Sequence, residues 1–97
     1  MIDLDLKGKR AVVTGASLGI GAASVKLLAD HGADVVFCAR NREAVEDLAS
    51  YSSKGGSVTG LVADMGNAES TDEFLVAAEA LGDCDILVNN VGASPSR

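Results

Sequence analysis

The chain has 97 residues, 47% of them apolar, and carries a formal net charge of −6. This length allows one small domain with a modest core, and the acidic excess argues against nucleic acid or an anionic membrane as a partner. Val, Leu and Ala dominate the apolar residues, which is typical of a buried parallel sheet covered by helices.

The two cysteines, Cys38 and Cys84, each adjoin an apolar run and are expected to be buried, reduced thiols. They form no C-x-x-C or Cys/His cluster, so a zinc site is not expected. The amphipathic, acidic start of the chain lacks the apolar core of a secretory signal, and no stretch reaches membrane-spanning length. These features predict a cytoplasmic location.

The first strand is expected over Arg10–Thr14, and a glycine-rich segment, Thr14–Gly21, connects it to a helix over Gly19–His31. Gly32 is placed to end this helix in a left-handed conformation. The residues expected to form one broad apolar face of the helix are Ile20, Ala23, Val25, Leu27 and Leu28.

A second strand, Asp34–Ala39, is an almost continuous apolar run, which is typical of a strand buried on both faces. Asn41 is placed to cap a helix over Arg42–Tyr51. A turn over residues 52–56 then leads to a third strand, Ser57–Ala63.

The capping box Ser70–Glu73 is expected to precede a third helix that ends near Leu81. A fourth strand is expected over Asp85–Val88, followed by a loop over residues 89–97. The alternation predicts an α/β fold with a parallel sheet, right-handed crossovers and strand order 3-2-1-4.

The same topology places the first two helices on one face of the sheet and the third on the other. The apolar fourth strand is then an edge strand covered by one helix alone, an arrangement that complete domains avoid. The chain is therefore expected to be the first part of a larger sheet.

The glycine-rich segment lies between a strand and a helix, where glycines let the backbone approach a ligand. The helix that begins there offers free N–H groups and its positive dipole end, so the segment predicts an anion site. It departs from the dinucleotide fingerprint G-x-G-x-x-G. Counted from Gly15, Ser17 replaces the second glycine; counted from Gly19, Ser24 replaces the last.

Arg40 follows the second strand, at the end that faces the adenosine ribose in nucleotide-binding α/β domains. An acidic residue there would bind the 2′-hydroxyl, whereas the planar fork of Arg40 suits a phosphate, with the Ser17 hydroxyl as a second donor. This pattern favours NADP over NAD. The alternative is that Arg40 and Arg42 are solvated residues at a helix start.

Two more polar segments follow strands. Asp64 can accept a hydrogen bond from the adenine amino group, with Val62 and Ala63 against the purine, or can cap the turn that follows it. The two amides of the segment Asn89–Gly92 can bridge backbone groups of neighbouring strands, and Gly92 allows a close approach to a ribose. A plain Asn/Gly turn is the alternative for that segment.

Together, Thr14–Gly21, Asp64 and Asn89–Gly92 resemble the short-chain dehydrogenase/reductase family, which has a T-G-x-x-x-G-[IL]-G turn, an Asp after the third strand and an N-N-A-G loop. The resemblance covers essentially the whole chain. It implies a Rossmann-like, three-layer α/β/α fold in which residues 1–97 are the N-terminal part of an NADP(H)-binding domain. The full-length member would be a homo-oligomeric oxidoreductase that transfers a hydride between NADP(H) and a small carbonyl or alcohol.

By this resemblance, the cofactor lies against residues from four segments. They are Gly15, Ser17, Leu18, Gly19, Ile20, Arg40, Asn41, Ala63, Asp64, Asn90, Val91 and Gly92. Asn90 would lie near the adenosine ribose and Asn89 would steady the sheet. Leu18 stands where some NADP-using members carry a basic residue, so Arg40 must supply most of the selectivity. Val91 replaces the usual alanine and narrows the approach to the ribose.

The family's catalytic Ser and its Y-x-x-x-K pair have no counterpart in the sequence. Tyr51 is followed four positions later by Gly55, and Lys54 is at the wrong spacing. His31 is expected at a helix end. The chain alone is therefore expected to bind cofactor without turnover. A stand-alone nucleotide-binding or regulatory module and an S-adenosylmethionine-binding domain remain as alternatives, the latter weakened by Arg40.

Overall fold

The structure is a computed structural model that describes residues 5–16 and 19–89. Within these ranges the strands form one parallel sheet in the order β3-β2-β1-β4. The strands are β1 (Arg10–Thr14), β2 (Asp34–Ala39), β3 (Ser57–Val62) and β4 (Ile86–Asn89). The helices are α1 (Gly19–Asp30), α2 (Arg42–Ala49) and α3 (Ala68–Ala80). The predicted fold class and strand order are confirmed.

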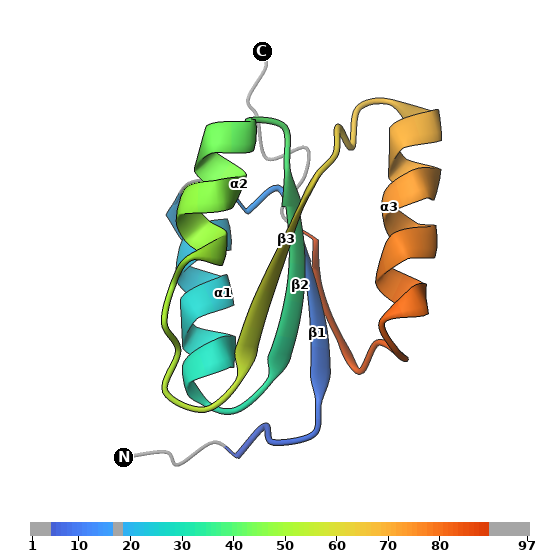
Figure 1. Cartoon of the computed structure of the whole chain (residues 1–97). Coiled ribbons are helices and arrows are strands. Elements are labelled where there is room, and N and C mark those ends of the chain that lie inside the picture. The colour runs from blue at the N-terminus through green and yellow to red at the C-terminus, as the bar shows by residue number, and fades with distance from the viewer. Residues whose placement is uncertain (1–4, 17–18, 90–97) are drawn as a thin grey trace.

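The sheet lies between two helical layers, with α1 and α2 on one face and α3 on the other (Figure 1). Right-handed crossovers require this arrangement, because the chain leaves β1 first toward β2 and β3 and then returns past β1 to β4. Neighbouring side chains of a strand point to opposite faces. Phe37 accordingly packs under α1 and α2 with Val25, whereas Cys38 packs under α3 with Phe74.

The expected broad apolar face of α1 does not pack as a unit. Val25 is fully buried, but Ile20 is 75% exposed and Leu27 is 54% exposed. The residues of α1 that are buried include Gly21 and Ala29. The small residues Gly21 and Ala29 let the helix lie close to the sheet, and Ile20 and Leu27 lie on parts of the helix surface that the sheet does not cover. The prediction for these two residues is wrong.

Helix ends follow the predicted chemistry with one exception. Asn41 caps α2 through its Oδ1, which accepts a hydrogen bond from the Ala44 amide at 2.9 Å, and Gly32 ends α1 with φ of +105°. The third helix, however, begins earlier than the expected capping box. Asn67 is its cap and accepts from the Ser70 amide at 2.9 Å. Asparagine is as good a cap as serine, so the earlier residue starts the helix.

Cys38 is buried as expected, but Cys84 is exposed. It lies in the turn ahead of β4, where its thiol donates to the Ile86 carbonyl at 3.2 Å. The expectation that both thiols are buried is therefore wrong for Cys84. Among the described residues, no helix is long and apolar enough to cross a membrane.

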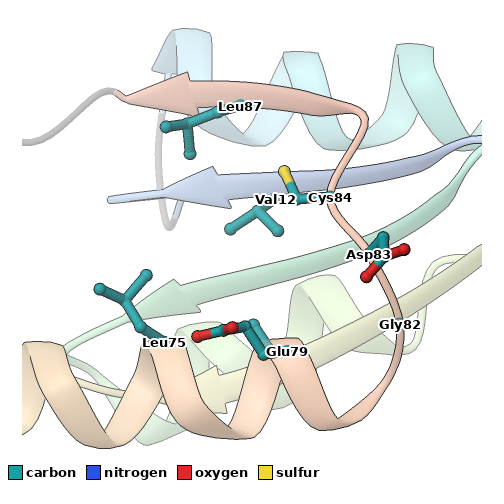
Figure 2. A pocket seen from close by; sticks show the side chains of 8 residues that line it. Val12, Leu75, Glu79, Gly82, Asp83, Cys84 and Leu87 are labelled. Atoms are coloured by element: carbon teal, nitrogen blue, oxygen red, sulfur yellow. The ribbon is translucent and has the colours of Figure 1, made fainter.

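An apolar hollow of about 340 Å³ separates α3 from the last strand (Figure 2). Leu75 of α3 and Leu87 of β4 face each other across it, with Val12 at its base. Leu87 is 62% exposed. The expected edge strand with an incompletely covered apolar face is thus present in the structure.

Tyr51 lies at the amino edge of the sheet, opposite the glycine-rich turn. Its hydroxyl donates to Asp30 Oδ2 at 2.8 Å, and the Lys54 amide donates to Asp30 Oδ1 at 3.1 Å. The ammonium of Lys26 lies 5.4 Å from the ring centroid. The Tyr51 hydrogen bond lowers the pKa of Asp30, and the same bond raises the pKa of Tyr51. The tyrosine therefore ties α1 to the α2–β3 connection.

Substituting Tyr51 by phenylalanine is expected to lower the free energy of unfolding at neutral pH, because it removes the hydroxyl and keeps the ring. A carboxyl whose folded pKa is lowered stabilises above its unfolded value of 3.8 and loses that contribution as the pH falls through the folded value. The difference between wild type and Y51F in urea denaturation should shrink from pH 7 to pH 3. A difference that stays constant would mean that the bond to Asp30 is not its source.

Candidate nucleotide-binding site

The turn after β1 lies at the carboxyl edge of the sheet. Gly15 and Gly19 have φ of +67° and +61°, values that favour glycine over residues with a Cβ. A Cβ on Gly19 would meet nothing within 4 Å, so the space in front of it is open. The Ala16 amide donates to the Cys38 carbonyl at 3.0 Å. This bond continues the β1–β2 ladder into the turn and fixes its position.

The start of α1 faces the same open space. The helix begins at Gly19, and Ile20, its second residue, is exposed. The exposed Ile20 side chain therefore lies beside the open space in front of Gly19. Ser17 and Leu18 lie outside the described residues, so their predicted contacts stay predictions.

The buried thiol of Cys38 accepts a hydrogen bond from the backbone of this turn. Burial raises the pKa of its thiol above the ordinary value, and a hydrogen bond from the Gly15 backbone lowers it to a smaller extent. The thiol is therefore protonated at neutral pH and acts as a small core side chain.

The end of β2 and the glycine-rich turn enclose a common hollow of about 550 Å³. The residues that line it are Gly15, Ala39, Arg40 and Asn41. None of them is acidic, and the Arg40 side chain is exposed. The Oδ1 of Asn41 accepts the capping bond of α2, and its Nδ2 is the group that can donate a hydrogen bond to a ligand. The structure thus brings Gly15, Arg40 and Asn41 together around one hollow.

Asp64 lies after β3 and belongs to a different hollow, of about 290 Å³, which Asn67, Glu69, Ser70 and Glu73 also line. Its Oδ1 accepts from the Gly66 amide at 2.9 Å, which is the turn-capping geometry named as the alternative to adenine binding. Its other carboxylate oxygen has no hydrogen-bond partner among the described residues. Both roles therefore fit the same side chain, one for each oxygen.

Ala63 connects this segment to the rest of the sheet edge. Its amide donates to the Ala39 carbonyl at 3.0 Å, one residue beyond β3. Ala63 is buried, whereas Val62 is 44% exposed. The backbone ladder thus holds the ends of β2 and β3 in fixed relation.

The ends of β1 and β4 are joined by side chains. The Thr14 hydroxyl, 6% exposed, donates to Asn89 Oδ1 at 3.0 Å. Asn89 therefore links β4 to β1 through the Thr14 side chain, a side-chain contact that differs from the expected bridge to backbone groups. Asn90, Val91 and Gly92 lie outside the described residues.

Sequence reasoning missed two polar partners of the site. Thr14 is the last residue of β1, and only the pairing of β1 with β4 reveals its contact with Asn89. The sequence predicts Ser70 as a helix cap, but its hydroxyl accepts from the Asp64 amide at 2.8 Å. The Asn67 cap leaves the Ser70 hydroxyl for this contact, and an alternative asparagine cap ahead of Ser70 is the sequence signal for it.

A family model described as short chain dehydrogenase matches residues 9–97. Among curated proteins, the uncharacterized oxidoreductase YvrD of Bacillus subtilis is 37% identical over 91 residues, which are 94% of this chain and 35% of the relative. The chain spans about a third of the length of the curated relatives it matches.

Solved structures give the same result. The Pseudomonas aeruginosa RhlG/NADP active-site complex superposes with a TM-score of 0.84 at 39% identity, over 95% of this chain and 38% of that one. The 3-ketoacyl-(acyl-carrier-protein) reductase of Brucella melitensis, complexed with NADH, gives 0.77 at 33% identity, over 86% and 34%. The two structures contain different nicotinamide dinucleotides, so the likeness leaves the choice between the phosphorylated and unphosphorylated forms to the residues of this chain.

Proposed function

Because the chain belongs to the short-chain dehydrogenase family, we propose that residues 1–97 are the N-terminal, NADP(H)-binding part of an oxidoreductase. The observation that carries the proposal is the hollow that the glycine-rich turn shares with Arg40 and Asn41, in which none of the described lining residues is acidic. The full-length protein would act on a small carbonyl or alcohol and form a homo-oligomer. The bound dinucleotide supplies the hydride, and this chain supplies binding and orientation.

The turn after β1 fits a pyrophosphate. The left-handed glycines Gly15 and Gly19 and the open space at the Gly19 Cβ position leave room for an anion next to the backbone. The first amides of α1 point out of the helix end and carry its positive dipole. Ile20 is exposed beside this space, where a bound dinucleotide would cover it.

Arg40 fits a ribose 2′-phosphate. Its guanidinium is exposed at the hollow, and it can bind a phosphate through two parallel N–H donors. An NAD-specific site would need a carboxylate at this position to accept from the 2′-hydroxyl. Arg40 therefore favours NADP(H) over NAD(H).

The remaining contacts complete the adenosine half of the site. The Asp64 carboxylate oxygen without a hydrogen-bond partner in the described chain would accept from the adenine amino group, and Ala63 would lie beside the base. Asn90, Val91 and Gly92 are assigned to the ribose side by sequence alone, and Ser17 and Leu18 to the phosphate side on the same basis.

Titration of the chain with NADPH, NADH and S-adenosylmethionine by isothermal calorimetry tests the proposal. We expect NADPH to bind at least about tenfold more tightly than NADH, as one charge-assisted bidentate contact provides. S-adenosylmethionine should give no binding heat. Equal affinity for the two dinucleotides would remove the role of Arg40, and preferential binding of S-adenosylmethionine would overturn the proposal.

When ketones are added, the same chain is expected to oxidise NADPH no faster than a blank without protein. Its single tyrosine donates its hydroxyl to Asp30 at the opposite edge of the sheet, so no phenol is available as a proton donor near the proposed site. Spectrophotometric oxidation of NADPH above the blank would contradict this expectation.

A further inference from the structure

The start of α3 forms a hydrogen-bonded frame around Asp64. The Asp64 amide donates to Ser70 Oγ at 2.8 Å, and the Asp64 carbonyl accepts from the Asn67 amide at 3.0 Å. Asp64 Oδ1 accepts from the Gly66 amide at 2.9 Å. Three polar groups of Asp64 are therefore held, and Oδ2 is the one polar atom of this residue without a hydrogen-bond partner among residues 5–16 and 19–89.

Ser70 lies in the first turn of a helix that packs against the sheet. It is the third residue of α3, and its amide donates to the capping Asn67 at 2.9 Å. One turn later Phe74 is 2% exposed and anchors the helix against the sheet. A hydroxyl on this anchored turn gives the Asp64 peptide a fixed reference point.

We propose that Ser70 is a positioning residue, whose hydroxyl fixes the Asp64 peptide so that the second carboxylate oxygen points at the exocyclic amino group of adenine. The inference rests on the proposed function, because it needs a dinucleotide with its base beside Asp64. Without the Ser70 hydroxyl the Asp64 amide loses its partner and the peptide can rotate. The ladder bond from Ala63 to Ala39 is untouched by that change, so the aim of the carboxylate alters while the sheet stays in place.

Replacing adenine by hypoxanthine in the ligand distinguishes a change in the direction of the Asp64 carboxylate from a loss of stability of the whole site. Adenine presents a 6-amino donor, whereas hypoxanthine presents a 6-oxo acceptor that a carboxylate repels. The ratio of the affinities for NADPH and for its hypoxanthine analogue, deamino-NADPH, therefore reports how well Asp64 is aimed. Any loss of stability that loosens the whole site would weaken both ligands together.

The experiment measures this ratio by calorimetry for two hydroxyl deletions, S70A against wild type and S70V against S70T. We expect each deletion to lower the ratio about threefold to tenfold, the value of one net hydrogen bond, and S70T to keep the wild-type ratio. Alanine is a good helix former, so S70A should keep α3, which urea denaturation checks. The S70V and S70T pair preserves the test if S70A does not fold.

Ser50→Ala is the matched control. The Ser50 hydroxyl donates to the Asp47 carbonyl at 2.6 Å at the end of α2, and among the described residues it makes no hydrogen bond to the Asp64 segment. S50A also exchanges a serine for an alanine, so it should lower stability and leave the ratio unchanged. In a D64N background, S70A should have no further effect on the ratio.

The possible failures are distinguishable. Wild-type chain that binds neither dinucleotide would contradict the proposed function itself. Wild-type chain that binds NADPH and deamino-NADPH equally would overturn both the Asp64–adenine contact and the role of Ser70, while NADP(H) binding stands. S70A and S70V variants that keep the wild-type ratio would overturn the role of Ser70 alone.

Discussion

Replacing Arg40 by aspartate is expected to weaken NADPH binding by about two orders of magnitude and to make NADH the preferred ligand. The substitution removes a charge-assisted bidentate contact, worth roughly 1.5–3 kcal/mol, and adds a carboxylate that repels the 2′-phosphate. The same carboxylate can accept from the 2′-hydroxyl of NADH. Calorimetric titration of both dinucleotides measures the reversal.

The control for Arg40→Asp is Arg42→Asp. Arg42 is the first residue of α2 and does not line the hollow, yet its substitution changes the net charge by the same amount. An aspartate in the first helical turn is favourable for the helix dipole, so R42D should keep both fold and NADPH preference. If R42D and R40D weakened NADPH equally, the effect would be one of overall charge and not of recognition.

Replacing Gly56 by alanine is expected to destabilise the chain by about 3 kcal/mol or more, a large part of the stability of a small domain. A Cβ there would overlap the Ala33 carbonyl oxygen and lie 2.8 Å from the Ala29 carbonyl oxygen. Both are backbone atoms at the end of α1, and Ala29 and Ala33 are fully buried, so neither can move aside cheaply. The Gly56 amide also donates a hydrogen bond to the Ala29 carbonyl oxygen at 2.8 Å, which holds the two backbones close together.

Gly55 provides the control for this substitution. A Cβ on Gly55 would make ordinary contact with Gly32, at 3.5 Å from its Cα, so G55A should be close to neutral, within about 0.5 kcal/mol. Urea denaturation of the two variants compares them directly. Similar stabilities for G55A and G56A would show that β3 can shift away from α1, and the close approach would then carry no cost.

The strands could be predicted almost to the residue because the strand cores are apolar runs between polar or glycine turns. Arg10–Thr14 and Asp34–Ala39 have the same bounds in sequence and structure. The face of α1 could not be predicted, because its apolar residues surround most of the helix and only the sheet decides which of them are covered. Ile20 and Leu27 were misplaced for that reason.

The sequence predicts the candidate site where a motif fixes the position of the backbone. It predicts less where a side chain has several possible hydrogen-bond partners. The position of Arg40 beside Gly15 follows from parallel pairing of β1 with β2. Which oxygen of Asp64 caps the turn and which is left for a ligand depends on where α3 starts. Its cap lies three residues earlier than a serine-based capping box indicates. Local caps of equal quality cannot be ranked from sequence alone.

The strand order has a consequence for how the chain is made. Thr14 and Asn89, which join the ends of β1 and β4, are 75 residues apart, whereas β2 is available to β1 soon after synthesis. At about 5–20 residues per second, β1 waits about 4–15 s on the ribosome before its second neighbour exists. A mostly buried strand, Arg10–Thr14, thus presents an unpaired edge for seconds. The interval open to misassembly is set by translation speed, and the stability of the finished sheet has no influence on it.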